Sequence, residues 1–313
     1  MEFTGGMTLL GGMTVTRQPP TYSAYAIFGY GTNASSVNVS VTNLVSNTGV
    51  VATDTTGVGT ARYGLAAAGY GTDKAIFGYG RTTTGQSMTN LVSNTGVVGN
   101  DVTGVGTARN VLAAAGYGTD KAIFGYGSDG GVDSSITNLV SNTGVVATDT
   151  AGVGTVRQQL AAAGYGTDKA IFGYGYSISL SSSRSTTNLV SNTGVVASDT
   201  TGVGTARQGL AAAGYGSSGQ ALFGYGSGDR SMTNLISNTG VVATDTTGVG
   251  TGRNNLAAAT YGGDKAIFGY GYNGSLGVVS MTNLVSNTGV VATDTTGVGT
   301  ARYTLAAASY GST

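Results

Sequence analysis

The chain has 313 residues, among them 56 Gly and 18 Tyr, and it contains no Trp, Cys or His. Its 14 Lys and Arg balance its 14 Asp and Glu, so it lacks the positive charge expected for partners such as nucleic acid or anionic membrane. The missing His and Cys exclude Ser-His-Asp and Cys-His catalysis and zinc held by these residues, and no apolar run approaches the ~18–20 residues of a membrane-inserted helix.

Residues 1–20 differ from the rest of the chain. Gly5-Gly-Met-Thr-Leu-Leu10 is followed directly by the similar Gly11-Gly-Met-Thr-Val-Thr16, and the only two prolines, Pro19 and Pro20, come next. Diproline favours an extended connector without backbone donors. We interpret residues 1–20 as an N-terminal arm with a Pro-Pro linker. The arm is either a loose tail or a short β-forming segment that adds to the sheet of a partner.

The repeat begins with two apolar runs joined by a tight turn. At its second occurrence these runs are Leu65–Tyr70 and Ala75–Tyr79, and Gly-Thr-Asp-Lys lies between them. Strand alternation places Ala75, Phe77 and Tyr79 on one face and glycine on the other. This pattern suits sheets stacked face to face, with a ring entering the space left by a glycine.

Two shorter strands are expected next, over Thr89–Ser93 and Gly96–Val98. Asn94-Thr-Gly between them is a hairpin signal. No segment shows a helical period of useful length. The sequence therefore predicts an all-β chain with four strands in each repeat.

The repeat occurs six times, at a spacing of 46 to 50 residues between its invariant arginines. The chain starts with the second half of a repeat at Ala26 and finishes with the first half at Leu305. Pairing the two halves would join the chain ends and remove exposed sheet edges. We therefore expect residues 21–313 to form a six-bladed β-propeller of four-stranded blades, closed by the C-terminal strand pairing in the first blade. A β-solenoid is the rival architecture, but it needs no closure.

The order of these features resembles the kelch repeat. An Arg, a small apolar strand, a turn, an apolar strand ending in glycines, a variable loop and then Thr-Asn-hydrophobic recur over residues 21–311. The near-identical repeats and the Gly-Gly-Met-Thr leader also look similar to kelch-like propeller proteins of marine bacteriophage particles. This resemblance implies a virion location.

Each repeat also carries an Asp eight residues before its invariant Arg. A functional interpretation makes these residues a charged ring at one mouth. In the structural interpretation, Asp caps the Thr-Gly turn and Arg holds the connector through charge-assisted hydrogen bonds. The structural Asp/Arg pairs are Asp54/Arg62, Asp101/Arg109, Asp149/Arg157, Asp199/Arg207, Asp245/Arg253 and Asp294/Arg302.

Other chemistry has little support. Paired carboxylates for glycoside hydrolysis are not apparent, because Glu2 is the only Glu and most Asp residues stand at repeated positions. Calcium held by Asp and carbonyl oxygens stays open, but we expect no metal and no cofactor. The repeated tyrosines either stack on sugars or pack between sheets, and their sixfold repetition favours packing.

The repeats differ mainly in the loop that follows each Phe-Gly-Tyr-Gly. Equivalent loops of a propeller emerge on one face, so they form either a composite binding face or a surface that is free to drift. The loops span residues 32–41, 81–88, 128–136, 176–186, 227–232 and 272–281. The candidate binding residues in them are Arg81, Gln86, Asp129, Asp133, Tyr176, Arg184, Asp229, Arg230, Tyr272 and Asn273.

These observations predict a non-enzymatic structural and binding protein. The resemblance implies that it belongs to a phage particle, as a tail, fibre or decoration component that is oligomeric in the particle. Its arm would contact other virion proteins, and its loop face a host receptor, either glycan or protein, or a neighbouring virion protein. The alternative is a secreted or cell-surface adhesin with the same face. A third hypothesis is a hydrolase that uses Asp and a bound metal.

Overall fold

The computed structural model describes residues 7–9, 13–15 and 23–312, and every regular element in this part of the chain is a β-strand. This confirms the all-β class. These residues accordingly include no helix that could cross a membrane. In the predicted arm, β1 (Met7–Leu9) pairs antiparallel with β2 (Met13–Val15). The Pro-Pro linker lies outside the described residues.

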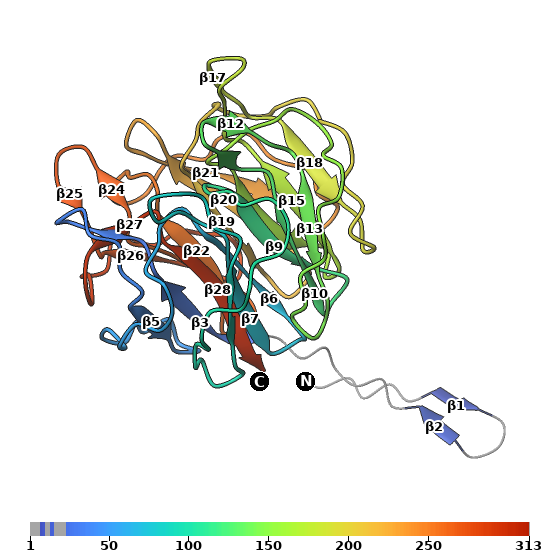
Figure 1. Cartoon of the computed structure of the whole chain (residues 1–313). Coiled ribbons are helices and arrows are strands. Elements are labelled where there is room, and N and C mark those ends of the chain that lie inside the picture. The colour runs from blue at the N-terminus through green and yellow to red at the C-terminus, as the bar shows by residue number, and fades with distance from the viewer. Residues whose placement is uncertain (1–6, 10–12, 16–22, 313) are drawn as a thin grey trace.

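The repeated unit is a three-stranded antiparallel sheet, which Figure 1 shows in successive colours along the chain. Each sheet has a first strand rich in Ala, a second strand that contains the Phe, and a third strand that contains Thr-Asn. The first strands are β6 (Ala66–Tyr70), β9 (Ala113–Tyr117), β14 (Ala161–Tyr165), β19 (Ala211–Tyr215), β22 (Ala257–Tyr261) and β28 (Ala306–Ser312). The second strands are β7 (Lys74–Gly78), β10 (Lys121–Gly125), β15 (Lys169–Gly173), β20 (Gln220–Gly226), β23 (Lys265–Gly269) and β3 (Ser23–Gly29). The third strands are β8 (Thr89–Val92), β13 (Thr137–Val140), β18 (Thr187–Val190), β21 (Arg230–Ile236), β26 (Thr282–Val285) and β5 (Thr42–Val45).

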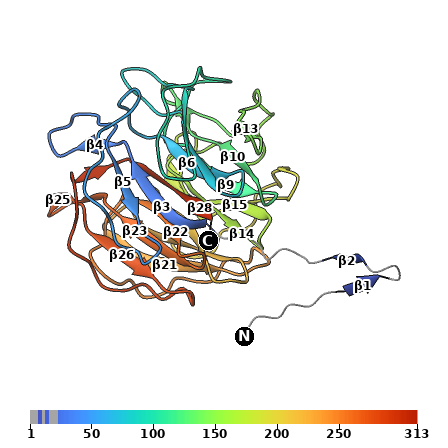
Figure 2. The same ribbon diagram turned by 90° about the horizontal axis from the view of Figure 1, so that it is seen from below.

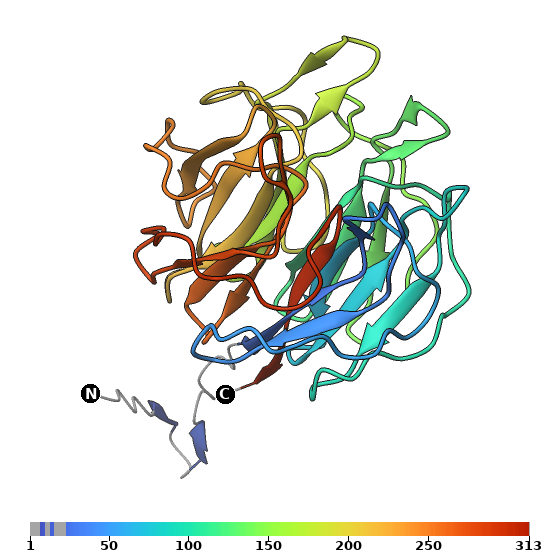
Figure 3. The ribbon, with the colours of Figure 1, turned by 90° about the vertical axis from the view of Figure 1, so that its left-hand side faces the viewer.

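The last strand of the chain shares a sheet with the first strand of the repeated region. β28 pairs antiparallel with β3, with Ala306 opposite Gly29 and Ala308 opposite Ile27. Figures 1 and 2 show the red C-terminal strand beside the blue one, and Figure 3 shows the same neighbourhood from the side. The pairing of the two chain ends, which the offset repeat predicted, is confirmed.

The prediction of a fourth strand over Gly96–Val98 is wrong, because the structure has only isolated bridges in this part of the repeat. Val98 pairs with Val92, and Val102 pairs with Thr89, so the register shifts by one residue between the two bridges. The side chain of Asn90 explains the shift. Its amide donates to the carbonyl of Gly99 at 3.0 Å, whereas in a regular ladder a backbone N–H would donate to this carbonyl. The same two bridges, with the same shift, occur beside every third strand.

Neighbouring sheets interlock through phenylalanine and glycine, as the strand alternation predicted. A Cβ atom on Gly29 would lie 2.8 Å from Cζ of Phe77, so only glycine leaves room for that ring. The six ring-on-glycine contacts are Phe77 on Gly29, Phe124 on Gly78, Phe172 on Gly125, Phe223 on Gly173, Phe268 on Gly224 and Phe28 on Gly269.

Tyr79 does not share the face of Phe77, which corrects the alternation expected from the sequence. The strand ends at Gly78, and Tyr79 has a left-handed φ of 63° that turns its side chain to the opposite side. There its ring lies 5.1 Å from that of Phe124, in the next sheet. Two rings therefore meet at each contact between sheets, one from either side.

The first strands approach one another closely, which explains their small side chains. A Cβ atom on Gly69 would lie 3.2 Å from the backbone oxygen of Ser309, and one on Gly116 would lie 3.4 Å from the oxygen of Gly69. β6 lies next to both β28 and β9, and β22 lies next to both β19 and β28. The alanines and glycines that recur in the first strands fit this close approach.

Removing residues 305–313 should expose the edge of β3 and destabilise the fold. The deletion removes Leu305, which is 5% exposed, together with the alanines of β28. Burial of a large apolar side chain contributes roughly 1.5–3 kcal/mol, and an unpaired edge promotes aggregation. We expect a lower melting temperature and oligomers in size-exclusion chromatography with light scattering. A control that lacks only Thr313 should behave like the parent, and a monomeric truncation with unchanged melting would contradict the role of β28.

Candidate functional site

Six buried arginines, one in each repeat, lie beside the end of the molecule from which the variable loops emerge, here called the loop end. Arg62 has no solvent exposure. Its Nε donates to the carbonyl of Tyr79 at 2.8 Å, Nη1 to the carbonyl of Thr60 at 3.1 Å and Nη2 to Oδ1 of Asn90 at 2.7 Å. The guanidinium carbon also lies 4.6 Å from the ring centre of Tyr30 in the preceding sheet. One arginine thus connects two sheets and the segment between them.

The Asp and Arg residues that the sequence grouped at a spacing of eight are not the ones in contact. Arg62 Nη1 lies 3.8 Å from Asp101, not beside Asp54, because the chain leads each arginine onto the sheet that carries the next aspartate. The ion pairs span 3.6 to 4.0 Å. They are Arg62–Asp101, Arg109–Asp149, Arg157–Asp199, Arg207–Asp245, Arg253–Asp294 and Arg302–Asp54.

Each aspartate holds the connector that arrives from the preceding sheet. Asp101 accepts hydrogen bonds from the backbone N–H and the hydroxyl of Thr60 and from the amide of Asn90. Partial burial alone would raise the pKa of Asp101, but these hydrogen bonds and the charge of Arg62 outweigh it and leave the pKa below its ordinary value. The capping and connector-holding roles expected of Asp and Arg are therefore present, between repeats rather than within one.

The repeated tyrosines are scaffold, as expected. The buried Tyr30 donates its hydroxyl proton to the carbonyl of Val58 at 3.0 Å, and burial raises the pKa of this phenol to about 12. Tyr79, Tyr126, Tyr174, Tyr225 and Tyr270 make the equivalent bond. The second set, which includes Tyr70, packs against the hairpin glycine of a neighbouring repeat, here Gly144. No tyrosine of either set is free to stack on a ligand.

The six variable loops gather at one end of the structure. The first residue of a loop pairs with the residue that follows an invariant arginine: Arg81 pairs with Tyr63, and Ser128 pairs with Asn110. Short hairpins extend three of these loops. They are formed by β11 (Ser128–Asp129) with β12 (Val132–Asp133), β16 (Tyr176–Ser177) with β17 (Ser182–Ser183), and β24 (Tyr272–Asn273) with β25 (Gly277–Val278). β4 (Thr32–Asn33), at the start of the first loop, pairs with β27 (Arg302–Tyr303) near the end of the chain.

Several predicted binding residues hold the loops themselves. The amide of Gln86 donates to Oγ1 of Thr82 at 3.1 Å, and Arg230 donates to the carbonyl of Ser227 at 2.6 Å. Asn273 is buried and accepts from the backbone N–H of Leu276 at 2.9 Å. The internal bonds of these side chains shape their own loops.

Two predicted acidic residues connect neighbouring loops. Asp133 Oδ2 accepts the backbone N–H of Ile178 at 2.6 Å, and Asp229 Oδ2 accepts that of Gly274 at 3.0 Å. Burial raises the pKa of Asp133, and the bond from Ile178 opposes this shift. Each carboxylate fixes the loop of the next repeat, so four of the six loops are positioned in two pairs.

The remaining predicted residues are accessible to different degrees. Asp129 and Tyr272 are exposed, and the Tyr272 ring lies 6.1 Å from that of Tyr303. Arg81, Tyr176 and Arg184 are half-buried. The loops also present exposed aliphatic side chains that sequence reasoning passed over: Val37, Val132, Leu180 and Leu276, exposed by 51% to 72%.

Sequence reasoning also missed the two residues that follow each invariant arginine. These dipeptides vary from repeat to repeat between an invariant Arg and an invariant Leu, and that contrast could have identified them. They are Tyr63-Gly64, Asn110-Val111, Gln158-Gln159, Gln208-Gly209, Asn254-Asn255 and Tyr303-Thr304.

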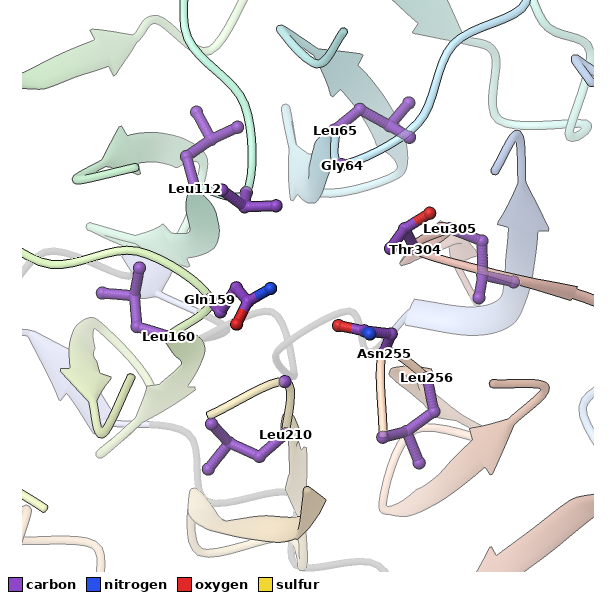
Figure 4. A pocket seen from close by; sticks show the side chains of 12 residues that line it. Gly64, Leu65, Leu112, Gln159, Leu160, Leu210, Asn255, Leu256, Thr304 and Leu305 are labelled. Atoms are coloured by element: carbon purple, nitrogen blue, oxygen red, sulfur yellow. The ribbon is translucent and has the colours of Figure 1, made fainter. Parts of the chain in front are cut away.

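The second residues of these dipeptides surround a recess of about 70 Å³, shown in Figure 4. Their backbones form an unbroken cycle of six hydrogen bonds of 2.6 to 2.9 Å, each N–H donating to the carbonyl of the residue one repeat away. All six have left-handed φ values between 48° and 63°. This conformation costs a non-glycine residue about 1–2 kcal/mol, and β-branched Val111 and Thr304 suit it least.

The described residues contain no group of three or more acidic side chains placed to share a metal ion. No known protein-family model and no curated protein sequence matches the chain. The interpretation of the loop end therefore rests on its own residues.

Replacing one buried arginine should destabilise the fold severely. Arg109→Ala removes three charge-assisted hydrogen bonds and leaves Oδ1 of the buried Asn138 without the donor that the arginine supplies. Hydrogen bonds to a charged group contribute roughly 1.5–3 kcal/mol each. Thermal unfolding followed by circular dichroism should show a large drop in melting temperature. The control Arg81→Ala, in a variable loop, should change stability by less than about 0.5 kcal/mol; similar effects of the two variants would contradict a special role for the buried set.

Proposed function

We propose that the six sheets form a closed, kelch-like six-bladed propeller. Three cyclic relations support this closure. β28 shares a sheet with β3, Arg302 pairs with Asp54 near the start of the repeated region, and the cycle of backbone hydrogen bonds returns from Thr304 to Gly64. The first relation is the pairing found between the first and second strands of every other sheet. The other two are the same contacts that join consecutive repeats.

The function that this architecture supports best is non-enzymatic binding through the loop end. The main observation in favour of this function is that the differences among repeats are concentrated in the loops and the dipeptides at one end of the structure. The residues that pack between sheets are repeated, whereas the loops and the dipeptides beside them differ in every repeat and lie at the same end. The exposed Val37, Val132, Leu180 and Leu276 add apolar surface to this end, as binding faces commonly have.

We place the protein in a bacteriophage particle, as a tail, fibre or decoration component. The resemblance of the repeats and leader to phage propeller proteins motivates this setting. In it, the N-terminal arm contacts other virion proteins and the loop end faces a host receptor or a neighbouring virion protein. The six loops around one end then act as a composite surface in which each repeat contributes a different segment.

Exchanging the loops should abolish binding without loss of the fold. In the test variant, the loops at 32–41, 128–136, 176–186 and 272–281 are replaced by the short segment 227–232, which the same scaffold already carries. Labelled protein is applied to a glycan array and to intact cells of a panel of marine bacteria. We expect the variant to lose the binding that the parent shows, while its far-ultraviolet circular dichroism spectrum stays unchanged.

A matched control changes the valines exposed in the hairpins that follow the third strands. Val50, Val97 and Val145 are 65% to 66% exposed, and their replacement by Ser should leave binding intact. If the loop-exchanged protein bound as the parent does, the loop end would not be the binding face. If the chain were found among the secreted proteins and not in purified particles, the adhesin alternative would replace the virion setting.

Deletion of residues 1–20 should prevent incorporation into particles. The arm carries the paired strands β1 and β2 and stands before the repeated region, so its loss leaves the loop end unchanged. Mass spectrometry of purified particles should show the full-length chain but not the deletion variant. Equal incorporation of both would remove the anchoring role of the arm.

A further inference from the structure

The recess at the loop end carries side chains at positions where the backbone favours glycine. Gly64 and Gly209 occupy two of the six left-handed positions, so glycine is compatible with the cycle of hydrogen bonds. Val111, Gln159 and Thr304 adopt the same conformation with φ values of 48° to 53°. Backbone strain of this kind is a recognised feature of functional sites, where the side chain is kept for what it contacts.

The two glycines make room for side chains of the following repeat. A Cβ atom on Gly64 would lie 3.2 Å from Cγ1 of Val111, and one on Gly209 would lie 3.0 Å from Oδ1 of Asn255. Small and large residues around the recess are thus matched to one another. The recess has a definite shape set by all six repeats.

The polar side chains of the recess are the amides of Gln159 and Asn255 and the hydroxyl of Thr304, which donates to the carbonyl of Tyr303 at 2.7 Å. The side chains of Gln159 and Asn255 extend toward one another across it in Figure 4. Asn255 Nδ2 donates to Oδ1 of Asn254 at 2.8 Å, which orients the amide and leaves its oxygen to accept. The side chain of Gln159 makes no hydrogen bond with any residue in the described part of the chain, so both its donor and its acceptor are available.

The other side chains of the lining are apolar and uncharged. Each repeat contributes an invariant leucine behind its variable residue, and these leucines are 4% to 5% exposed. None of the lining residues is ionisable. A recess of about 70 Å³ is far smaller than the roughly 300 Å³ of the smallest usual ligand pockets, so it admits a substituent rather than a whole ligand.

We propose that this recess binds the acetamido group of an N-acetylated amino sugar, an inference that rests on the proposed binding role of the loop end. An acetamido group combines one amide with one methyl group. Its N–H and carbonyl match the free acceptor of Asn255 and the free amide of Gln159, and its methyl group matches the leucines and Val111. A charged substituent would find no counter-charge in this lining.

The first residues of the dipeptides are neutral. They are Tyr63, Asn110, Gln158, Gln208, Asn254 and Tyr303, each one position before a residue that lines the recess. Neutral polar and aromatic residues at these positions are compatible with the uncharged hydroxyls and the apolar face of a sugar. The acetamido group would fix the orientation of the ligand, and the variable loops would contact what extends beyond it.

The test is calorimetric titration of the full chain with N-acetylglucosamine and N-acetylgalactosamine, and with glucose and galactose as the sugars that lack the acetamido group. We expect binding of at least one N-acetylated sugar and at least tenfold weaker binding of its parent sugar. N-acetyllysine amide, which carries the same group on an amino acid, should bind more weakly than the sugar. Tighter binding of N-acetyllysine amide would overturn the assignment to a sugar.

The matched variants separate binding from folding. Gln159→Gly and Asn255→Gly place at these positions the residue found at Gly64 and Gly209, so the fold should persist with little change in melting temperature, while affinity falls at least tenfold. The control Thr119→Gly relieves a similar left-handed residue, φ 71°, in a turn between β9 and β10 and should leave affinity unchanged.

Failure of this inference is distinct from failure of the proposed function. If no N-acetylated sugar binds while the loop-exchanged variant still loses array or cell binding, the recess is not an acetamido site but the loop end remains the binding face. Binding of a sugar that both glycine variants retain would place it elsewhere and equally overturn the proposal. A third outcome is that the glycine variants lose affinity for the sugar while the loop-exchanged variant still binds the array as the parent does. This result would contradict the wider role of the loops.

Discussion

The buried arginine is the interaction on which the rest of the structure depends. Removing a guanidinium from water is costly unless hydrogen bonds satisfy it. Arg62 meets this requirement through Tyr79, Asn90 and the carbonyl of Thr60, with Tyr30 beneath it. These partners come from two sheets and the connector, so satisfying one charge fixes how neighbouring sheets meet. Five of the six arginines make all three bonds, and Arg302 makes two.

A scaffold fixed in this way leaves its loop end free to vary. The arginine holds the residues on both sides of the loop start, so loops of different length and composition begin from the same bridge. Asp133 and Asp229 then position individual loops on their neighbours. Variation in sequence can change the surface without disturbing the contacts between sheets. The residues around the recess differ from the scaffold in this respect. Four of the six keep a side chain although their left-handed backbone conformation favours glycine.

The candidate site was only partly predictable from the sequence. Variation among repeats located the loops, but it did not show that Gln86, Arg230 and Asn273 bind within their own loops. Those roles depend on how each loop folds back, which short polar segments do not specify. The variable dipeptides after each arginine were visible in the sequence. Their importance appears only in the structure, because the second residues, separated along the chain by a whole repeat, meet around one recess.

The sequence by itself determined three strands of each repeat, the tight turns, the insertion of Phe77 beside a glycine and the pairing of the chain ends. These follow from local alternation, from turn residues and from the offset of the repeat. Tertiary structure alone decided three features. Asn90 replaces ladder bonds and prevents a fourth strand, the left-handed Tyr79 reverses its face, and Arg62 pairs with Asp101 rather than Asp54. Since every repeat carries the same Asp, its spacing cannot identify the partner; the path of the connector onto the next sheet does.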